Sequence, residues 1–246
     1  MSENTPLGKR LWITGTDTDV GKTVVTALVA AAFQGIGLKT QVAKPLQSGA
    51  VLLPGQSPTV ASPDLQSVRA WLKTAVPTWC GVCLEAPATP WIADETQHGH
   101  PSIDLERITA QLIDFGAQGD VTVVEAAGGV YVPLTPTQTV LGWLTTIADP
   151  VIVVARPNLG TINHTLLTVN ALLERNIPVL GVVVSGWDSD STDIAQQTLP
   201  QVFERFLPVP VLAWVPRVAL NPQCIRPDHG AVEALFPALA SWVKGA

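Results

Sequence analysis

Continuous runs of apolar residues alternate along the chain with longer segments of helical periodicity, and this alternation limits the possible folds. Residues 151–155 and 178–184 are entirely apolar and rich in valine. A strand without polar residues at alternate positions must be covered on both faces, which is typical of a parallel sheet between two helical layers. The sequence therefore predicts an α/β fold, a doubly wound and mainly parallel sheet with helices on both faces.

The order of the expected elements fits this fold class. Strands are expected at residues 11–14, 40–43, 121–125, 151–155, 178–184 and 209–215. Helices are expected at residues 23–33, 64–74, 102–115, 161–175 and 192–206, with one more at the C-terminal end. The helix at 102–115 is expected to follow Ser102, because serine is a favourable N-cap residue. Residues 51–63, rich in Pro, Gly and Ser, are expected to be a long loop within one domain that covers residues 1–246.

Charge and hydropathy exclude several classes of function. The chain has 14 Lys and Arg against 20 Asp and Glu, a formal net charge of −6, which disfavours electrostatic binding to nucleic acid or an anionic membrane. No apolar run approaches the roughly 18 residues that span a membrane, and residues 1–10 lack the apolar stretch of a signal peptide. We expect a cytoplasmic protein that binds small molecules.

The three cysteines indicate a reducing compartment rather than a disulfide framework. Two of them form the motif Cys80-Gly81-Val82-Cys83, but there is no second such motif, and His98 and His100 lack zinc-ligand spacing. A thioredoxin-like pair would lie at a strand-to-helix junction, whereas prolines at 77, 87 and 90 indicate a surrounding loop. The motif is therefore interpreted as two ordinary buried or half-buried cysteines.

The segment Gly15-Thr16-Asp17-Thr18-Asp19-Val20-Gly21-Lys22-Thr23 lies between the first expected strand and the first expected helix, where a phosphate loop belongs. Backbone N–H groups at the helix start would face phosphate oxygens, Lys22 would add a positive charge, and the Thr23 hydroxyl would be a ligand of Mg²⁺. Thr16 stands where the standard pattern has Gly. The strand, loop and helix nevertheless follow in the required order, which favours nucleotide binding over a chance Gly-Lys-Thr.

Three other segments place polar groups at the ends of expected strands. Glu125 ends an apolar strand and is followed by small residues, so it is a candidate for holding Mg²⁺. Lys44 ends the second strand and would face a ligand at the carboxyl edge of a parallel sheet. Residues 158–164 open a helix that is suited to holding an anionic group. Taken singly, a Glu or Lys in such a place is more often a solvated strand end.

Together these four segments resemble the dethiobiotin synthetases, the ATP-dependent ligases of biotin synthesis. The resemblance covers residues 14–23, then Lys44-Pro45 with Ser48-Gly49, Glu125 with Gly128-Gly129, and residues 159–164. It implies a P-loop NTPase fold and an ATP-, Mg²⁺- and CO₂-dependent ring closure on 7,8-diaminononanoate that yields dethiobiotin, ADP and phosphate. The implied intermediates are a carbamate and a mixed carbamic-phosphoric anhydride.

The resemblance also implies a role for each site residue. Lys22 and Lys44 would stabilise charge on the phosphate and carbamate. Mg²⁺ would be arranged by Thr23, Asp64 and Glu125, and the diamine would lie beside Thr18, Lys44 and Ser48. The nucleotide would contact Asp19, Val20, Gly21, Lys22, Thr23, Val24, Asp64, Glu125, Ala126, Ala127, Gly128, Ser185 and Gly186. The diamine's carboxylate would be held by Gly160, Thr161, Ile162 and Asn163 of the neighbouring subunit, which implies a homodimer.

Departures from the family and two rival functions stay open at this point. The family carries an Asn that reads adenine where this chain has Ser185-Gly186-Trp187, so no nucleotide base is predicted. One rival is a nucleotide-switch ATPase of the partition or septum-placement type, although the loop lacks that group's early lysine. The other is an amidotransferase-type ligase related to cobyrinic acid diamide synthases, whose attached glutaminase is missing here. The apolar residues 140–144 are expected to be either a dimer interface or a core helix.

Overall fold

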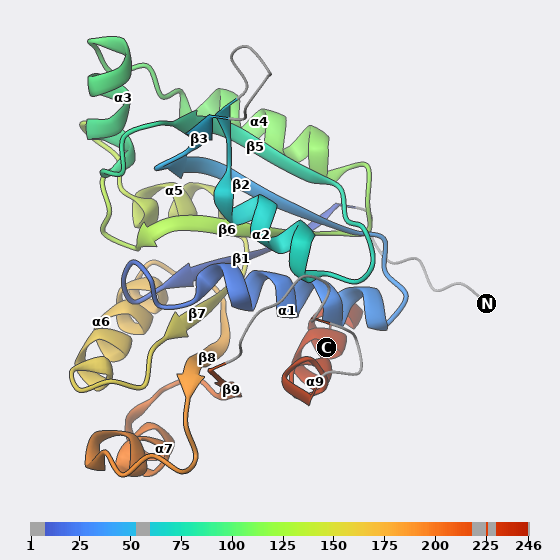
Figure 1. The fold of residues 1–246 in the computed structure, drawn as a ribbon, viewed down its shortest axis with the longest axis vertical. Helices are drawn as coiled ribbons and strands as arrows, with labels where there is room; N and C mark the ends of the chain where they lie inside the picture. The colour runs from blue at the N-terminus through green and yellow to red at the C-terminus, as the bar shows by residue number, and fades with distance from the viewer. Residues whose placement is uncertain (1–7, 53–59, 218–224, 226–229, 246) are drawn as a thin grey trace.

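A parallel sheet of seven strands organises the computed structural model, which describes residues 8–52, 60–217, 225 and 230–245. The strand order is β5-β2-β6-β1-β7-β8-β9, and every ladder in this sheet is parallel (Figure 1). The seven strands are β1 (Lys9–Gly15), β2 (Thr40–Ser48), β5 (Thr78–Leu84), β6 (Val121–Gly129), β7 (Val151–Ala155), β8 (Val179–Trp187) and β9 (Val211–Pro216). A separate hairpin is formed by β3 (Val51–Leu52) and β4 (Val60–Ala61).

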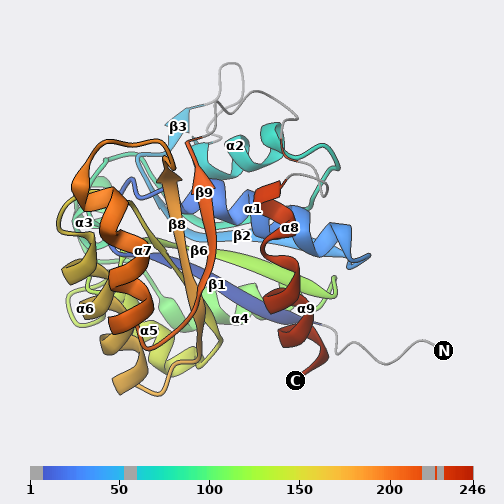
Figure 2. The same ribbon diagram turned by 90° about the horizontal axis from the view of Figure 1, so that it is seen from below.

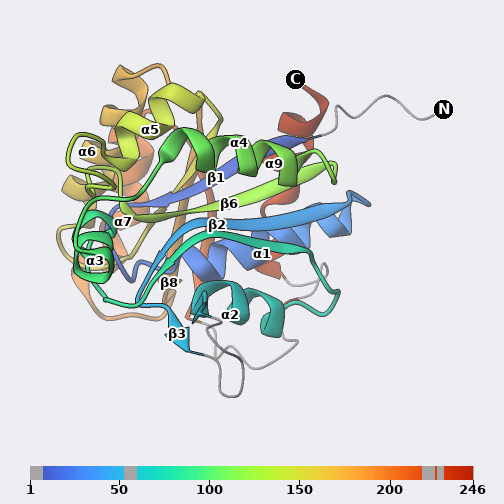
Figure 3. The ribbon, with the colours of Figure 1, turned by 90° about the horizontal axis from the view of Figure 1, so that it is seen from above.

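Helices cover both faces of the sheet. The face that carries α1 also packs against α2, α8 and α9, and the opposite face packs against α4, α5, α6 and α7 (Figures 2 and 3). The helices are α1 (Lys22–Gly35), α2 (Pro63–Trp71), α3 (Pro90–His98), α4 (Leu105–Gly116), α5 (Val140–Ile147), α6 (Thr161–Glu174), α7 (Ile194–Phe206), α8 (Gly230–Glu233) and α9 (Phe236–Lys244). Among the described helices, none is long and apolar enough to cross a membrane. The predicted doubly wound α/β fold is confirmed.

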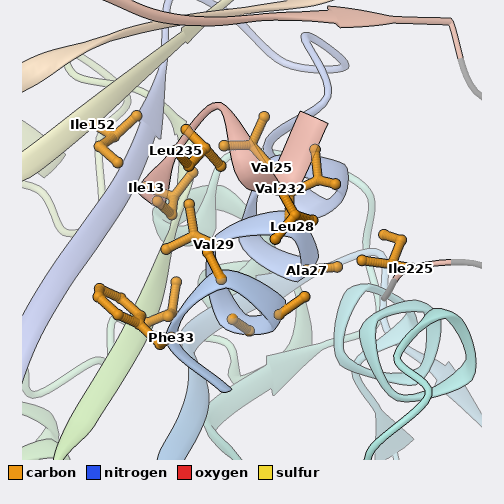
Figure 4. Packing of buried hydrophobic residues seen from close by; sticks show 14 of the residues in the cluster. Ile13, Val25, Ala27, Leu28, Val29, Phe33, Ile152, Ile225, Val232 and Leu235 are labelled. Carbon is orange, nitrogen blue, oxygen red and sulfur yellow. The ribbon is translucent and has the colours of Figure 1, made fainter. Parts of the chain in front are cut away.

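Each face of the sheet has its own apolar core. On one face, Val25 and Leu28 of α1 pack beside Val232 and Leu235 (Figure 4). On the other face, the rings of Trp12 and Trp143 meet edge to face with their centroids 5.2 Å apart. Burying both sides of the central strands explains why their sequences contain so few polar residues. Residues 140–144 belong to α5 and are mostly buried in this second core, so the core-helix alternative is confirmed.

The structure corrects the loop expected around the cysteine motif. Cys80 and Cys83 lie on β5, which pairs with β2 from Val42↔Thr78 to Ser48↔Leu84. The neighbouring prolines suggested a loop, but they flank the strand rather than interrupt it. Pro45 of β2 forms no ladder pair between the pairs Lys44↔Cys80 and Leu46↔Val82, as expected for a residue that has no backbone N–H to donate.

Two smaller expectations are also corrected. The N-cap of α4 is Asp104, whose side chain accepts a hydrogen bond from the Arg107 N–H at 2.9 Å. Ser102 instead donates its hydroxyl and its backbone N–H to the buried Asp94 of α3, so it is not available as a cap. Within the expected loop at 51–63, the two short strands β3 and β4 pair with each other in antiparallel fashion. Residues 53–59 lie outside the described residues.

Candidate functional site

The carboxyl ends of β1, β2 and β6 open onto a cavity of about 860 Å³. Its walls come from the loop after β1, the starts of α1 and α2, and residues 87–90. Parallel pairing brings these strand ends to one edge of the sheet, which is where open α/β sheets bind ligands. Of the predicted site residues, the cavity is lined by Thr18, Asp19, Gly21, Lys22, Thr23, Val24, Lys44, Ser48, Asp64, Glu125, Ala127 and Gly128.

The loop between β1 and α1 has the backbone of an anion-binding site. Gly21 has φ 95° and is the N-cap of α1, where no side chain caps the first N–H groups. A residue with a Cβ would be strained at this φ and would also strike the Ser185 side chain. The uncapped N–H groups and the positive end of the helix dipole favour a phosphate at this position.

Lys22, the first residue of α1, extends along this loop. Its Nζ donates a hydrogen bond to the Asp17 carbonyl oxygen at 2.8 Å. Burial lowers the pKa of Lys22 from 10.5 to about 8, with the nearby positive charge of Lys44 acting in the same direction. A bound anion would oppose both effects and raise the pKa of Lys22. The charged form of this lysine would therefore be stabilised by a negatively charged ligand.

Lys44 of β2 stands at the centre of a buried charge cluster. Its Nζ lies 2.8 Å from Glu125 Oε1 and 2.8 Å from Asp64 Oδ2, and it also donates to the Ala126 carbonyl oxygen at 3.3 Å. The side chains of Lys44 and Glu125 are 5% and 2% exposed, whereas that of Asp64 is 29% exposed. Three elements, β2, β6 and α2, thus bring their charges together at one point.

The electrostatics of this cluster keep Lys44 charged. Burial alone would lower the pKa of Lys44, but the Glu125 and Asp64 carboxylates outweigh it and raise the pKa. A buried charge that loses its partner is strongly destabilising, so the ion pairs also fix the position of the lysine. The cluster is therefore a preorganised cation with two carboxylates beside the phosphate loop.

The residues predicted to hold Mg²⁺ lie together and fit the ion. Thr23 Oγ1 donates to Glu125 Oε1 at 3.0 Å, and Asp64 reaches the same cluster through Lys44. Glu125 Oε2 is buried and has no hydrogen-bond partner, so a lone pair is available on the carboxylate. No group of three or more His, Cys, Asp or Glu gathers among the described residues. Such a sparse set suits Mg²⁺, which binds one or two carboxylates together with substrate phosphates and water.

Several cavity residues were missed by the sequence analysis. Gln47 is buried, and its Oε1 accepts a hydrogen bond from the Ser62 hydroxyl at 2.6 Å. Ser62 in turn caps α2 by accepting from the Leu65 N–H at 3.1 Å. Residues 87–90 and Val132 complete the wall. The signal that indicates Lys44 is its position toward the carboxyl edge of a parallel sheet, and it applies equally to Gln47 because β2 extends to Ser48.

Other predicted site residues do not line this cavity. Val20 is buried in the core, and Ala126 meets the site through its backbone carbonyl, which accepts from Lys44. Ser185 packs against Gly21 at the end of β8, next to Gly186. Gly160, Thr161, Ile162 and Asn163 lie at the start of α6, outside the lining of the cavity.

Comparisons with known proteins point to one family. A family model described as an AAA domain matches residues 9–222. The chain is 38% identical over 213 residues to the biotin biosynthesis bifunctional protein BioCD of Bordetella avium, covering 85% of this chain and 39% of that protein. It is 34% identical over 217 residues to the ATP-dependent dethiobiotin synthetase BioD of Thermodesulfovibrio yellowstonii, covering 83% of this chain and 87% of the relative. The corresponding Bacillus subtilis enzyme is 32% identical, over 85% of this chain and 87% of the relative.

Solved structures confirm the P-loop NTPase type of the fold. The cell division ATPase MinD of Pyrococcus furiosus matches with a TM-score of 0.62 and 17% identity, over 98% of this chain and 100% of that chain. A ParA family ATPase of Chlorobium tepidum matches with a TM-score of 0.57 and 14% identity, over 94% and 98% of the two chains. At such low identity the likeness is one of fold alone.

Proposed function

Because the chain belongs to the family of ATP-dependent dethiobiotin synthetases, we propose that it converts 7,8-diaminononanoate, CO₂ and ATP into dethiobiotin, ADP and phosphate. The observation that carries this proposal is the position of Lys44. It is held between Glu125 and Asp64 in the same cavity as the phosphate loop, where a transferring phosphate and an acceptor would both meet a fixed cation. Preorganised charge of this kind stabilises a transition state without reorganisation during the reaction.

The proposed reaction has three steps. One amine of the substrate adds to the carbon of CO₂ and loses a proton, which gives a carbamate. A carbamate oxygen then attacks the γ-phosphorus of ATP, so that a new P–O bond forms and the bond to ADP breaks. The second amine attacks the carbonyl carbon of the resulting anhydride, closes the ureido ring, expels phosphate and loses a proton. Every step after the first builds or moves negative charge near the phosphate loop.

The two lysines have different tasks in this scheme. The pKa of Lys22 is lowered in the free protein. A triphosphate bound at the start of α1 would place negative charge beside Lys22 and favour its protonated form. Lys44 is already charged and paired in the free protein, so its contribution to the carbamate and the transferring phosphoryl group is prepared before binding. Holding the reactants between them would supply proximity as well as charge.

Mg²⁺ would be held by Thr23, Asp64 and Glu125, with the unpartnered Glu125 Oε2 as the most available oxygen. The ion would neutralise charge on the phosphate oxygens. The diamine would lie beside Thr18 and Ser48, which line the cavity. The Ser48 hydroxyl is buried without a hydrogen-bond partner in the free protein, and a substrate amine or carbamate would satisfy it.

We also propose a homodimer in which residues 160–163 complete the partner's site. These residues start α6 outside their own chain's cavity, and the adjacent Leu159 is 90% exposed. Mixing inactive Lys44→Ala and Asn163→Asp chains tests this arrangement. Only a mixed dimer contains one site with both residues intact, so activity should reappear on mixing. Two variants that stay inactive together in a verified mixed dimer would contradict shared sites.

The proposed function is tested by phosphate release with Mg-ATP and bicarbonate, with and without 7,8-diaminononanoate, while the organic product is identified by mass. We expect release to require the diamine and to yield one dethiobiotin per phosphate. Release that is indifferent to the diamine but stimulated by DNA or lipid would instead favour a nucleotide-switch ATPase. Lys44→Ala is the matched inactive control.

A further inference from the structure

Two cysteines with no part in the proposed reaction lie in direct contact on β5. Cys80 Sγ and Cys83 Sγ are 2.7 Å apart, and both side chains are half-buried free thiols. Residues three apart in a regular strand point to opposite faces. β5 departs from this pattern, because Trp79 and Val82 are three apart and both pack into the core beneath α4. Cys80 lies on the other face of the strand, where it packs against the core that contains α1 and contacts Cys83.

The local backbone explains this placement. Gly81 lies so close to β2 that an added Cβ would be 2.5 Å from the Pro45 carbonyl oxygen. Glycine at this position therefore lets the strand approach its neighbour and turn the two thiols toward each other. β5 is an edge strand of the sheet and is paired within the sheet on one side only, and both thiols keep partial exposure to solvent.

The two thiols differ in their protonation. The hydrogen bond between them, reinforced by burial, raises the pKa of Cys80 and keeps it protonated. The same hydrogen bond lowers the pKa of Cys83. The thiolate form is the nucleophile in thiol–disulfide exchange, so Cys83 would attack first and Cys80 would resolve the product.

We propose that Cys80 and Cys83 form a redox-modification site, which closes reversibly to a disulfide by exchange with a low-molecular-weight disulfide such as glutathione disulfide. Cys83 sulfur attacks one sulfur of the reagent, which forms a mixed disulfide and releases one glutathione. Cys80 loses its proton and attacks Cys83 sulfur, which breaks the mixed disulfide and releases the second glutathione. Two protein thiols are oxidised, and one glutathione disulfide is reduced to two thiols.

The closed form leaves the charge cluster in place. Lys44 of β2 is the register partner of Cys80 on β5. The Lys44 Nζ is nevertheless held by the carboxylates of Glu125 and Asp64 and not by either sulfur. Since the sulfurs already touch, closing the bond requires little movement of β5. The site therefore takes up oxidising equivalents at the edge of the sheet without disabling the nucleotide cavity.

The test uses the full chain with Cys224→Ser, so that only this pair remains. After incubation with glutathione disulfide, intact-mass analysis should show a loss of two hydrogens that dithiothreitol reverses, and peptide mapping should join Cys80 to Cys83. In the same background, Cys80→Ser should instead retain one glutathionyl group, and it should acquire that group faster than Cys83→Ser does.

Three results would overturn the proposal. They are an unchanged mass, a mixed disulfide that persists when both cysteines are present, or a loss of ADP affinity of more than tenfold in the oxidised protein. The expected change in ADP affinity is within about twofold, because Lys44 is held by Glu125 and Asp64 and each sulfur contacts the other. Mass and ADP binding do not depend on the ligase reaction, so this proposal and the proposed function can fail separately.

Discussion

The two sides of β1 differ in how far their ion pairs are buried. On one side, β2 and β6 extend beyond the ends that the sequence predicted, so Lys44 and Glu125 lie within the strands, almost completely buried and paired with each other. On the other side, β7 is followed by Arg156, whose guanidinium meets Asp17 at 3.1 Å with both side chains about half exposed. Both pairs join segments far apart in the sequence, yet only the first is removed from water.

The far side of the sheet, β7 to β9, relies on apolar packing instead of charge. The rings of Trp187 and Trp214 have centroids 4.5 Å apart, and Phe203 packs against Trp214. A buried ion pair is costly unless its geometry is fixed, whereas apolar packing tolerates exchange of one residue for another. The comparison shows that the buried charged groups described above lie on the side of the sheet that lines the cavity. The side with β2 and β6 holds a buried charge cluster, and the side with β7 to β9 is held together mainly by packing.

The largest effect is expected for Lys44→Ala. It removes the cation of the cluster and leaves the buried Glu125 unpaired. We expect turnover to fall on the order of 100- to 1,000-fold, with a loss of about 3–5 kcal/mol in the free energy of unfolding. Lys39→Ala is the control, since Lys39 is exposed just before the same strand. Steady-state kinetics and urea unfolding measure both quantities, and near-wild-type turnover in Lys44→Ala would remove the lysine from the mechanism.

A smaller, specific effect is expected for Ser62→Ala. Ser62 joins Gln47 to the start of α2, which carries Asp64 toward Lys44. Loss of an N-cap costs about 1 kcal/mol. If the cap also positions Asp64, the Mg²⁺ concentration for half-maximal activity should rise several-fold.

Asp104→Ala is the matched control for Ser62→Ala. It removes the cap of α4, which does not line the cavity, and should lower stability by a similar amount without changing the Mg²⁺ requirement. An equal Mg²⁺ requirement in both variants would reduce Ser62 to a purely structural role.

Ser48→Ala should act mainly on substrate binding. Its hydroxyl is buried at the cavity without a partner, so removing it costs the free protein little. We expect the KM for the diamine to rise about tenfold, which is the order of one hydrogen bond to a charged group, while kcat stays nearly constant. An unchanged KM would place the diamine elsewhere.

The lowered pKa of Lys22 predicts a proton linkage. At a pH near 8 the lysine is about half protonated in the free protein, and a bound phosphate should complete its protonation, so ADP binding should take up about half a proton. Calorimetry in two buffers with different ionisation enthalpies measures this uptake. Lys22→Arg, which does not titrate in this range, should abolish it, and equal uptake in the variant would contradict the assignment.

The same shift affects stability with a definite sign. The pKa is about 8 in the folded protein and 10.5 at its ordinary value, so the unfolded chain binds more protons between these limits. The contribution of Lys22 to the free energy of unfolding should therefore rise with pH from about 8 to about 10.5. Lys22→Met should flatten this part of the pH profile, and an unchanged profile would contradict the shift.

The smallest effect is expected on the opposite side of β1. Arg156→Ala removes an ion pair whose two side chains are 43% and 51% exposed. Such pairs contribute about 0–1 kcal/mol, which is reduced further by salt. Urea unfolding of this variant beside Lys44→Ala therefore measures the contrast between the two sides directly. A loss as large as that of Lys44→Ala would erase the contrast.

Sequence reasoning succeeded where chemistry and periodicity impose one answer. Apolar runs indicated the buried strands, and the order of strand, glycine-rich loop and helix indicated Lys22 and Thr23. It failed at β5, because residues such as Cys80 and Gly81 carry no strong strand signal, and pairing with β2 decides their conformation. It also missed the link from Gln47 to Ser62, because a contact across an intervening loop leaves no pattern in the sequence.

Measuring whether oxygen passes from bicarbonate to phosphate distinguishes the proposed synthesis of dethiobiotin from simple ATP hydrolysis. With ¹⁸O-labelled bicarbonate, unlabelled water and the diamine, phosphate from the first turnovers should contain one labelled oxygen, because the bridging oxygen of the anhydride leaves with phosphorus. Phosphate that carries no label, while dethiobiotin still forms, would contradict the anhydride. Phosphate without label and without dethiobiotin would mean that the cavity around Lys44 hydrolyses ATP for another purpose.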